Sequence, residues 1–293
     1  MITPALKIGD KLGVIAPSSP FLRSQLKKGI KEFEKFGFNI YIPDEIFARK
    51  GYLAGDAEIR AKTVEKMFSD KSVKGIICAR GGFGSTHLFS KINFNLIKEN
   101  PKVFIGFSDL TPILNYFAFK LGFVTFHGPM LASSFSKKLT ENAKTSFYKA
   151  VTGKFPYKIK SRSIKTLKGG KASGRLSGGN LSLIISTVGT PYETSFENKI
   201  LFIEDVEEPA YKIDRMLTHL RDSGRLKGAK GIIFGDICKN PPAVKQLIKE
   251  FAASLNIPAI SSFPAGHILN NHTLTIGANV ILNADERIVE ISG

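Results

Sequence analysis

The sequence predicts an α/β protein with an N-terminal parallel-sheet domain covered by helices and a smaller C-terminal α/β domain that contains an antiparallel β portion. In the first half, short apolar runs alternate with stretches of helical spacing, a pattern that favours a parallel sheet covered on both faces. The chain closes with three short apolar segments typical of antiparallel strands. Its 293 residues, 43% of them hydrophobic and 23% charged, suffice for one large or two medium globular domains.

The elements expected in the first half follow from the spacing of apolar residues. The opening apolar run ends at Pro17 and two serines, as expected of a buried strand that feeds a helix. That helix places Leu26, Ile30, Phe33 and Phe36 on one face. The expected strands lie within 11–20 and at 38–42, 75–79 and 103–107, and the expected helices at 22–36 and 56–68.

The composition changes in the middle of the chain. Residues from about 153 to 176 are rich in Lys, Ser, Arg and Gly with little apolar periodicity, which indicates a connection between domains. The expected division is an N-terminal domain at 1–153, a linker at 154–176 and a C-terminal domain at 177–293. Expected helices in the second half are 181–188 and 210–221, and expected strands are 199–203, 231–235, 273–276, 279–282 and 287–291.

The net charge of +17 raises the question of nucleic-acid binding. The lysines are scattered, and the densest places, 27–28, 137–138 and 154–171, do not interleave aromatic residues as a single-strand groove would. We therefore expect a lysine-biased surface and no nucleic-acid partner. The alternative use of the charge is to steer an acidic small substrate.

The compartment is predicted from what the sequence lacks. The N-terminus lacks the basic start, the long apolar run and the cleavage site of a secretory signal. No uninterrupted run of about 18 apolar residues, as a membrane-spanning helix needs, occurs in the sequence. Cys78 and Cys238 are expected to be free thiols rather than a disulfide. These features predict a cytoplasmic protein without a membrane partner.

Ser108 is a candidate nucleophile. It follows the strand expected at 103–107 and precedes a helix start, and the carboxyl ends of strands in an open α/β sheet form the binding crevice. Leu110 stands where the pattern G-x-S-x-G has its second Gly, so the nucleophile-elbow motif is not matched. The alternative is that Ser108 only caps the helix.

Two further strand ends carry candidate groups. The glycine-rich loop 80–85 allows backbone N–H groups to approach a ligand, so it could cradle a phosphate or supply an oxyanion-hole donor. It lacks the ending of a P-loop and the spacing of a dinucleotide fingerprint. Glu204 is the first polar residue after the apolar run 201–203, where it could orient a histidine.

Two of the histidines qualify equally as a base. His127 and His267 both lie in turn-rich segments at the ends of apolar runs, and a base needs only reach and a suitable pKa. His219 lies within an expected amphipathic helix, His87 follows the glycine-rich loop, and His272 is in a polar turn. No zinc-ligand spacing is present, so no metal site is expected.

Taken together, these segments resemble the LD-carboxypeptidase family of serine peptidases, which includes muropeptide LD-carboxypeptidases and microcin-immunity peptidases. The segments occur in the family's order and span nearly the whole chain. They are 13–19, 80–84, 106–111, 126–130, 178–181, 202–206 and 266–267.

The resemblance implies roles for the candidate residues. It implies Ser108 as the nucleophile, His267 as the general base and Glu204 as the acid that orients it, and so separates His267 from His127 where spacing does not. It also implies an oxyanion hole formed by the backbone N–H groups of Gly82 and Asp109. No cofactor is implied.

The resemblance also implies a substrate. For muropeptidase members it is a murein tetrapeptide, cut between the L-centre of a dibasic residue and the terminal D-Ala, with Arg80 and Gly81 as candidates for binding the substrate. The microcin-immunity branch stacks a Trp on a nucleotide, and this chain has no Trp. The family further suggests a homodimer. The remaining alternative is a non-catalytic module that binds an anionic ligand at the Gly82 loop.

Overall fold

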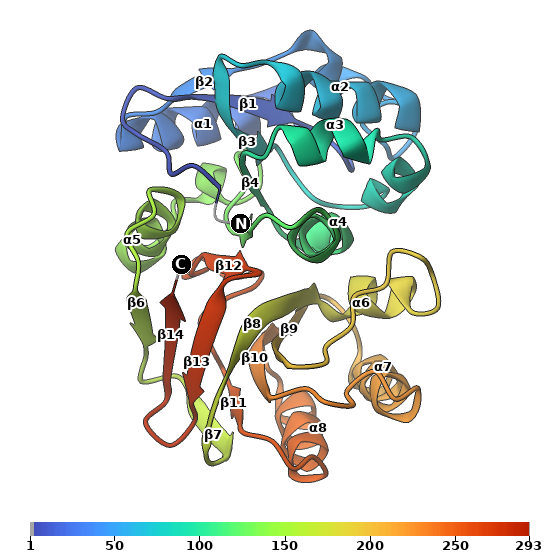
Figure 1. Cartoon of the computed structure of the whole chain (residues 1–293), viewed down its shortest axis with the longest axis vertical. Coiled ribbons are helices and arrows are strands. Elements are labelled where there is room, and N and C mark those ends of the chain that lie inside the picture. The colour runs from blue at the N-terminus through green and yellow to red at the C-terminus, as the bar shows by residue number, and fades with distance from the viewer. Residues whose placement is uncertain (1–2, 293) are drawn as a thin grey trace.

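The computed structural model describes residues 3–292, which form two β-sheets that lie one above the other in Figure 1. The first sheet has six strands in the order β12-β5-β4-β3-β1-β2, and the second has eight in the order β6-β14-β13-β8-β9-β10-β11-β7. Both sheets combine parallel and antiparallel pairs. The predicted α/β class with an antiparallel portion is therefore confirmed.

The first sheet consists of parallel strands with one antiparallel strand at its edge. Strands β1 to β5 pair in parallel, and β12 pairs antiparallel with β5. Almost every residue of β3, β4 and β5 is buried, which explains their continuous apolar sequences. The bounds are β1 Lys11–Ile15, β2 Asn39–Tyr41, β3 Val73–Cys78, β4 Val103–Gly106, β5 Thr125–His127 and β12 Leu274–Ile276.

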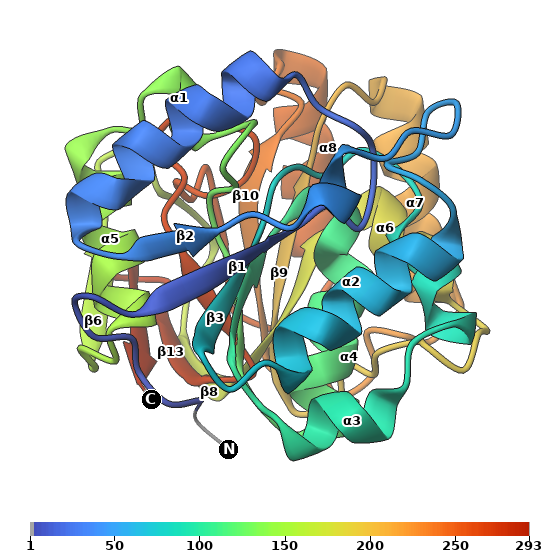
Figure 2. The same ribbon diagram turned by 90° about the horizontal axis from the view of Figure 1, so that it is seen from above.

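Helices cover both faces of this sheet, as Figure 2 shows. Leu12 and Val14 of β1 share a hydrophobic cluster with Phe33 and Phe147 of α1 and α5, whereas Ile15 packs in a second cluster with residues of α2, α3 and α4. The alternating side chains of one strand thus enter different cores. The helices are α1 Arg23–Phe33, α2 Ala57–Ser69, α3 Phe94–Glu99, α4 Thr111–Tyr116 and α5 Glu141–Val151.

The second sheet has a parallel centre and antiparallel flanks. Strands β8 to β11 pair in parallel, β13, β14 and β6 extend the sheet antiparallel beyond β8, and β7 pairs antiparallel with β11. The strands are β6 Tyr157–Lys160, β7 Lys165–Lys168, β8 Lys171–Asn180, β9 Lys199–Asp205, β10 Gly231–Ile237, β11 Ala259–Ser261, β13 Asn279–Asn283 and β14 Ile288–Ser292, and the helices are α6 Leu181–Thr187, α7 Ala210–Asp222 and α8 Pro242–Ala253.

Two sequence-based assignments differ from the structure. The segment 154–176, expected to be a linker, supplies β6, β7 and the first part of β8. Its outward side chains are mostly Lys, Ser and Arg, so strand periodicity is weak, although Tyr157 and Ile159 face the core. The segment 273–276, expected in the antiparallel ending, instead joins the first sheet beside β5, where it covers an edge that would otherwise be unpaired.

Helix α4 joins the two sheets. Asn115 is buried, and its amide donates to the carbonyl of Gly178 at 2.9 Å and accepts from the N–H of Gly178 at 2.9 Å and the hydroxyl of Ser177 at 2.9 Å. Thr111 Oγ1 accepts from the N–H of Asn180 at 3.0 Å. These contacts attach the helix that follows Ser108 to the end of β8, and therefore set the distance between the two halves.

Replacing Asn115 with Ala should lower the free energy of unfolding by about 2–3 kcal/mol, because the buried N–H and C=O of Gly178 would lose their partners. Urea unfolding followed by circular dichroism measures the change. Asn142→Ala, at an exposed position of α5, is the matched control and should change stability by less than about 0.5 kcal/mol. Equal effects of the two substitutions would contradict this role of Asn115.

Candidate active site

Three of the candidate side chains form a hydrogen-bonded series between the two sheets. Ser108 follows β4 of the first sheet, Glu204 lies near the end of β9 in the second, and His267 is in the loop after β11. The Nε2 atom of His267 lies 3.1 Å from Ser108 Oγ, and its Nδ1 atom lies 2.6 Å from Glu204 Oε2. The fold thus brings together residues separated by 159 and 63 positions in the sequence.

Ser108 occupies a left-handed backbone conformation, with φ of 65°. That region costs free energy for residues other than Gly and is frequent at functional sites. Ser108 begins a short 3-10 helix, but its hydroxyl caps no backbone N–H and contacts His267 instead, so the helix-cap interpretation is wrong. Leu110, which replaces the second Gly of the elbow motif, is fully buried beside Gly106.

The glycine-rich loop lies directly beside Ser108. A Cβ on Gly81 would lie only 3.1 Å from Ser108 Cβ, so a larger residue would crowd the hydroxyl. Gly82 has φ of 116°, and across residues 3–292 its N–H donates to no protein acceptor. The N–H of Asp109 is in the first turn of the 3-10 helix, where N–H groups lack intrahelical partners. Both N–H groups are thus available to a ligand.

The buried side chain of Asp109 ties this loop to the turn at Ser108. Its Oδ2 atom accepts from Ser18 Oγ at 2.5 Å and from the N–H of Ser85 at 2.8 Å, and its carbonyl accepts from Ser85 Oγ. Arg60 is also buried and donates to the carbonyl oxygens of Pro17 and Gly84. These bonds hold three strand ends together.

Sequence reasoning missed these supporting residues. Ser18 lies inside a segment noted for its resemblance and Ser85 ends the glycine-rich loop 80–85, but both as turn residues rather than as partners of Asp109. Arg60 is one cation among many on an expected helix, and no sequence signal marked it as buried.

Glu204, which is buried, and His267, which is partly buried, form a pair that favours opposite charges. Burial raises the pKa of Glu204, but the charge and hydrogen bond of His267, with a smaller contribution from His127, outweigh it and hold that pKa at about 2. Burial lowers the pKa of His267, but the negative charge of Glu204 outweighs it and raises that pKa above the ordinary 6.5. The carboxylate is therefore ionised and stabilises a proton on the imidazole.

The remaining histidines do not contact Ser108. His127 is completely buried at the end of β5, with Nε2 4.0 Å from Glu204 Oε1. His87 contacts the ring of Phe83, and burial lowers the pKa of His272 to about 4. Of the two histidines between which sequence spacing could not choose, His267 is the one within hydrogen-bonding distance of the serine.

Arg80 is exposed at the same strand end, and its Nη1 atom donates only a long bond, 3.4 Å, to the carbonyl of Pro20. The guanidinium is thus accessible to a ligand beside the glycine-rich loop 80–85.

Cys78 and Cys238 are free thiols. Among the described residues, no group of three or more His, Cys, Asp or Glu side chains could hold a metal ion. Within the same residues, no helix is both long and apolar enough to cross a membrane.

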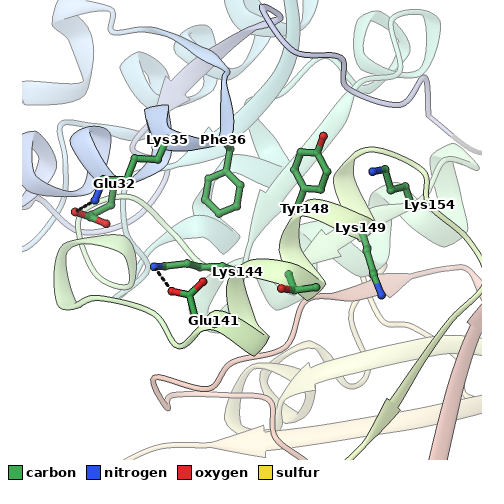
Figure 3. A pocket seen from close by; sticks show the side chains of 9 residues that line it. Glu32, Lys35, Phe36, Glu141, Lys144, Tyr148, Lys149 and Lys154 are labelled. Atoms are coloured by element: carbon green, nitrogen blue, oxygen red, sulfur yellow. Dashed lines mark hydrogen bonds and ion pairs between the residues drawn. The ribbon is translucent and has the colours of Figure 1, made fainter.

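A separate surface cavity of about 430 Å³ lies against α1 and α5 and includes none of the three residues (Figure 3). Four of its lining residues are lysines around Phe36 and Tyr148. Lys35 pairs with Glu32 at 2.7 Å and Lys144 with Glu141 at 2.7 Å, while Lys154 lies over the ring of Tyr148. Half of the lysine charge in this cavity is therefore neutralised locally.

Two family models match the two halves of the chain. The model of the LD-carboxypeptidase N-terminal domain matches residues 12–128, and that of the LD-carboxypeptidase C-terminal domain matches 173–282. The chain is 36% identical to a probable murein peptide carboxypeptidase of Bacillus subtilis, over 98% of this chain and 93% of that protein.

The fold is also similar to solved structures over nearly the whole chain. The chain is similar to an MccF-like protein from Bacillus anthracis, with a TM-score of 0.91, 27% identity and coverage of 100% and 99% of the two chains. It is also similar to a muramoyltetrapeptide carboxypeptidase from Oxalobacter formigenes, with a TM-score of 0.86, 26% identity and coverage of 97% and 99%.

The Glu204–His267 pair should stabilise the fold most between pH 4.5 and 6.5, the ordinary pKa values of the two groups. The lowered pKa of Glu204 contributes stability above 4.5 that is lost as the pH falls towards 2. The raised pKa of His267 contributes stability below 6.5 that is lost as the pH rises through its folded value. Glu204→Gln should therefore cost about 3 kcal/mol near pH ~5.5 and less near pH ~9.

Urea unfolding at the two pH values measures this difference. Glu286→Gln removes an exposed carboxylate and should leave stability nearly unchanged at both. A cost of Glu204→Gln that does not depend on pH would contradict the assignment of charges.

Proposed function

The chain belongs to the LD-carboxypeptidase family, and we propose that it is a serine carboxypeptidase that releases the terminal D-Ala from murein tetrapeptides. The observation that carries the proposal is the series Ser108–His267–Glu204, with bonds of 3.1 and 2.6 Å. The Bacillus subtilis relative, which covers nearly the whole chain, supports the substrate class. The proposal assigns the nucleophile to the N-terminal domain and its two partners to the C-terminal domain.

In the proposed reaction, His267 Nε2 takes the proton of Ser108 Oγ as that oxygen attacks the carbonyl carbon before D-Ala. The protonated imidazole then gives its proton to the amine of D-Ala as the C–N bond breaks. Water loses a proton to His267 and attacks the acyl-enzyme, and Ser108 regains its proton as the peptide leaves. Glu204 holds the tautomer and stabilises the imidazolium throughout.

The oxyanion that forms in both steps needs preorganised donors. We assign this role to the N–H groups of Gly82, which follows Gly81 in the loop beside Ser108, and of Asp109, the residue after Ser108. The bonds from Ser18 and Ser85 to Asp109 support this assignment, because donors that are already held in place require no reorganisation during the reaction.

The substrate ends in a carboxylate, which requires a cationic or N–H-rich subsite. Arg80, whose guanidinium is exposed, and Gly81, which lies beside Ser108, are the residues proposed to bind it. The net charge of +17 would increase the encounter rate with an acidic murein peptide. A cytoplasmic location and a homodimeric state are part of the same proposal.

A second candidate is a peptidase of the microcin-immunity type, favoured by the fold likeness to the MccF-like protein. The absence of Trp from this chain counts against it, since that branch stacks a Trp on a nucleotide. The candidates differ in substrate rather than in mechanism. An aminoacyl sulfamoyl adenosine, offered in competition with a murein tetrapeptide, distinguishes them.

Ser108→Ala should reduce D-Ala release from a murein tetrapeptide by at least about 10⁴-fold, because the acyl-enzyme cannot form. Mass spectrometry of the peptide before and after incubation measures the loss of one D-Ala. Ser90→Ala, at an exposed serine, is the control and should retain full activity. Undiminished release by Ser108→Ala in a folded protein would refute the proposed nucleophile.

A further inference from the structure

One oxygen of Glu204 lacks a hydrogen-bond partner. Its Oε2 atom bonds His267, but Oε1 is buried without a partner among the described residues. The polar atom facing it is Nε2 of His127, at 4.0 Å. Both ring nitrogens of His127 are also buried and unpartnered within residues 3–292. Unpaired buried polar groups cost free energy, so this facing pair needs an explanation.

The position of His127 is fixed by the fold. It ends β5, between Gly106 of β4 and Leu274 of β12. Its ring makes edge contacts with Phe107, the residue before the nucleophile, at 5.4 Å and with Phe202 of β9 at 5.1 Å. The completely buried ring therefore faces the carboxylate of Glu204 and not solvent.

A direct bond is the arrangement that satisfies both groups. An N–H···O bond of about 2.9 Å requires the two atoms to approach by roughly 1 Å, which a small rotation of the Glu204 carboxylate supplies. A bridging water is less suitable, because two bonds of about 2.8 Å at a near-tetrahedral angle separate the outer atoms by roughly 4.5 Å. The gap of 4.0 Å is shorter than that.

We propose that His127 is a positioning residue that donates a hydrogen bond from Nε2 to Oε1 of Glu204, so that two histidines hold one carboxylate. This inference rests on the proposed function, because it gives Glu204 a task in catalysis. The bond from His127 fixes the carboxylate plane with Oε2 towards His267 Nδ1. It also withdraws part of the negative charge that would otherwise act on His267.

The charged surroundings of this site are few. Glu204 faces His127 directly and also binds His267, and Asp205 and Asp236 act on His267 from β9 and β10. The neighbouring strands β4 and β12 carry no titratable residue. A change in the titration of His267 after substitution of His127 is therefore attributable to Glu204.

The test compares His127→Phe, which keeps a ring but has no donor, with His127→Gln, which restores an N–H donor. His127→Phe should lower kcat for D-Ala release by about 10- to 100-fold. It should also move the ascending limb of the pH profile of kcat/KM to higher pH by about half a unit, since Glu204 then acts on His267 alone. His127→Gln should return the ascending limb to its wild-type pH and restore most of kcat. His219→Phe, on α7 away from the site, is the matched control.

A purely structural role would lower the melting temperature without shifting the ascending limb of the pH profile. An unchanged position of that limb in folded His127→Phe would overturn the proposal.

Nitrogen-15 NMR of the histidine rings tests the bond without substrate. In the wild-type protein Nε2 of His127 should carry a proton, and in His127→Phe the titration of His267 should move upward. A wild-type tautomer with the proton on Nδ1 would overturn the inference even if His127→Phe did not fold. Absence of D-Ala release by the wild-type protein would instead refute the proposed function and leave the NMR result to decide on His127.

Discussion

The hydrogen bond between Glu204 and His267 is the interaction on which the arrangement of the site depends. A carboxylate with no exposed surface is stable only when its charge is compensated, and the bond of 2.6 Å to His267 Nδ1 provides this compensation. The bond requires the end of β9 and the loop after β11 to meet. It also directs the other ring nitrogen of His267 towards Ser108, so a local electrostatic requirement orients the proposed base.

The opposite side of the site depends on a second buried network. Asp109 receives bonds from Ser18 and Ser85, and Arg60 donates to carbonyl oxygens of the same loops. Together they hold the ends of β1, β3 and β4 in one cluster around the left-handed turn at Ser108. Ser108 keeps its left-handed backbone conformation, which costs free energy, because the surrounding hydrogen bonds and the burial of Leu110 hold the turn in place.

Much of the fold could be predicted from local patterns. Helices such as α2 and α7 and strands such as β3 and β9 lie close to their expected bounds, because apolar spacing reports directly on burial. The sequence predicts a linker at 154–176 because the Lys-rich edge strands β6 and β7 have weak apolar periodicity. The placement of β12 depends on pairing with a strand about 150 residues earlier, and no local pattern encodes that partner.

The sequence by itself determined which chemical groups lie at the strand ends: a hydroxyl at Ser108, a carboxylate at Glu204, a glycine-rich loop, and two histidines, His127 and His267, that qualify equally as the base. Their roles required either family resemblance or geometry. Only the tertiary structure decided that His267 reaches Ser108 whereas His127 lies buried behind Glu204. The physical reason is that the distances between distant segments, and the burial of their side chains, arise from sheet topology and from contacts such as the bond between Asn115 of α4 and Gly178 of β8. Neither is a property of residues adjacent in the chain.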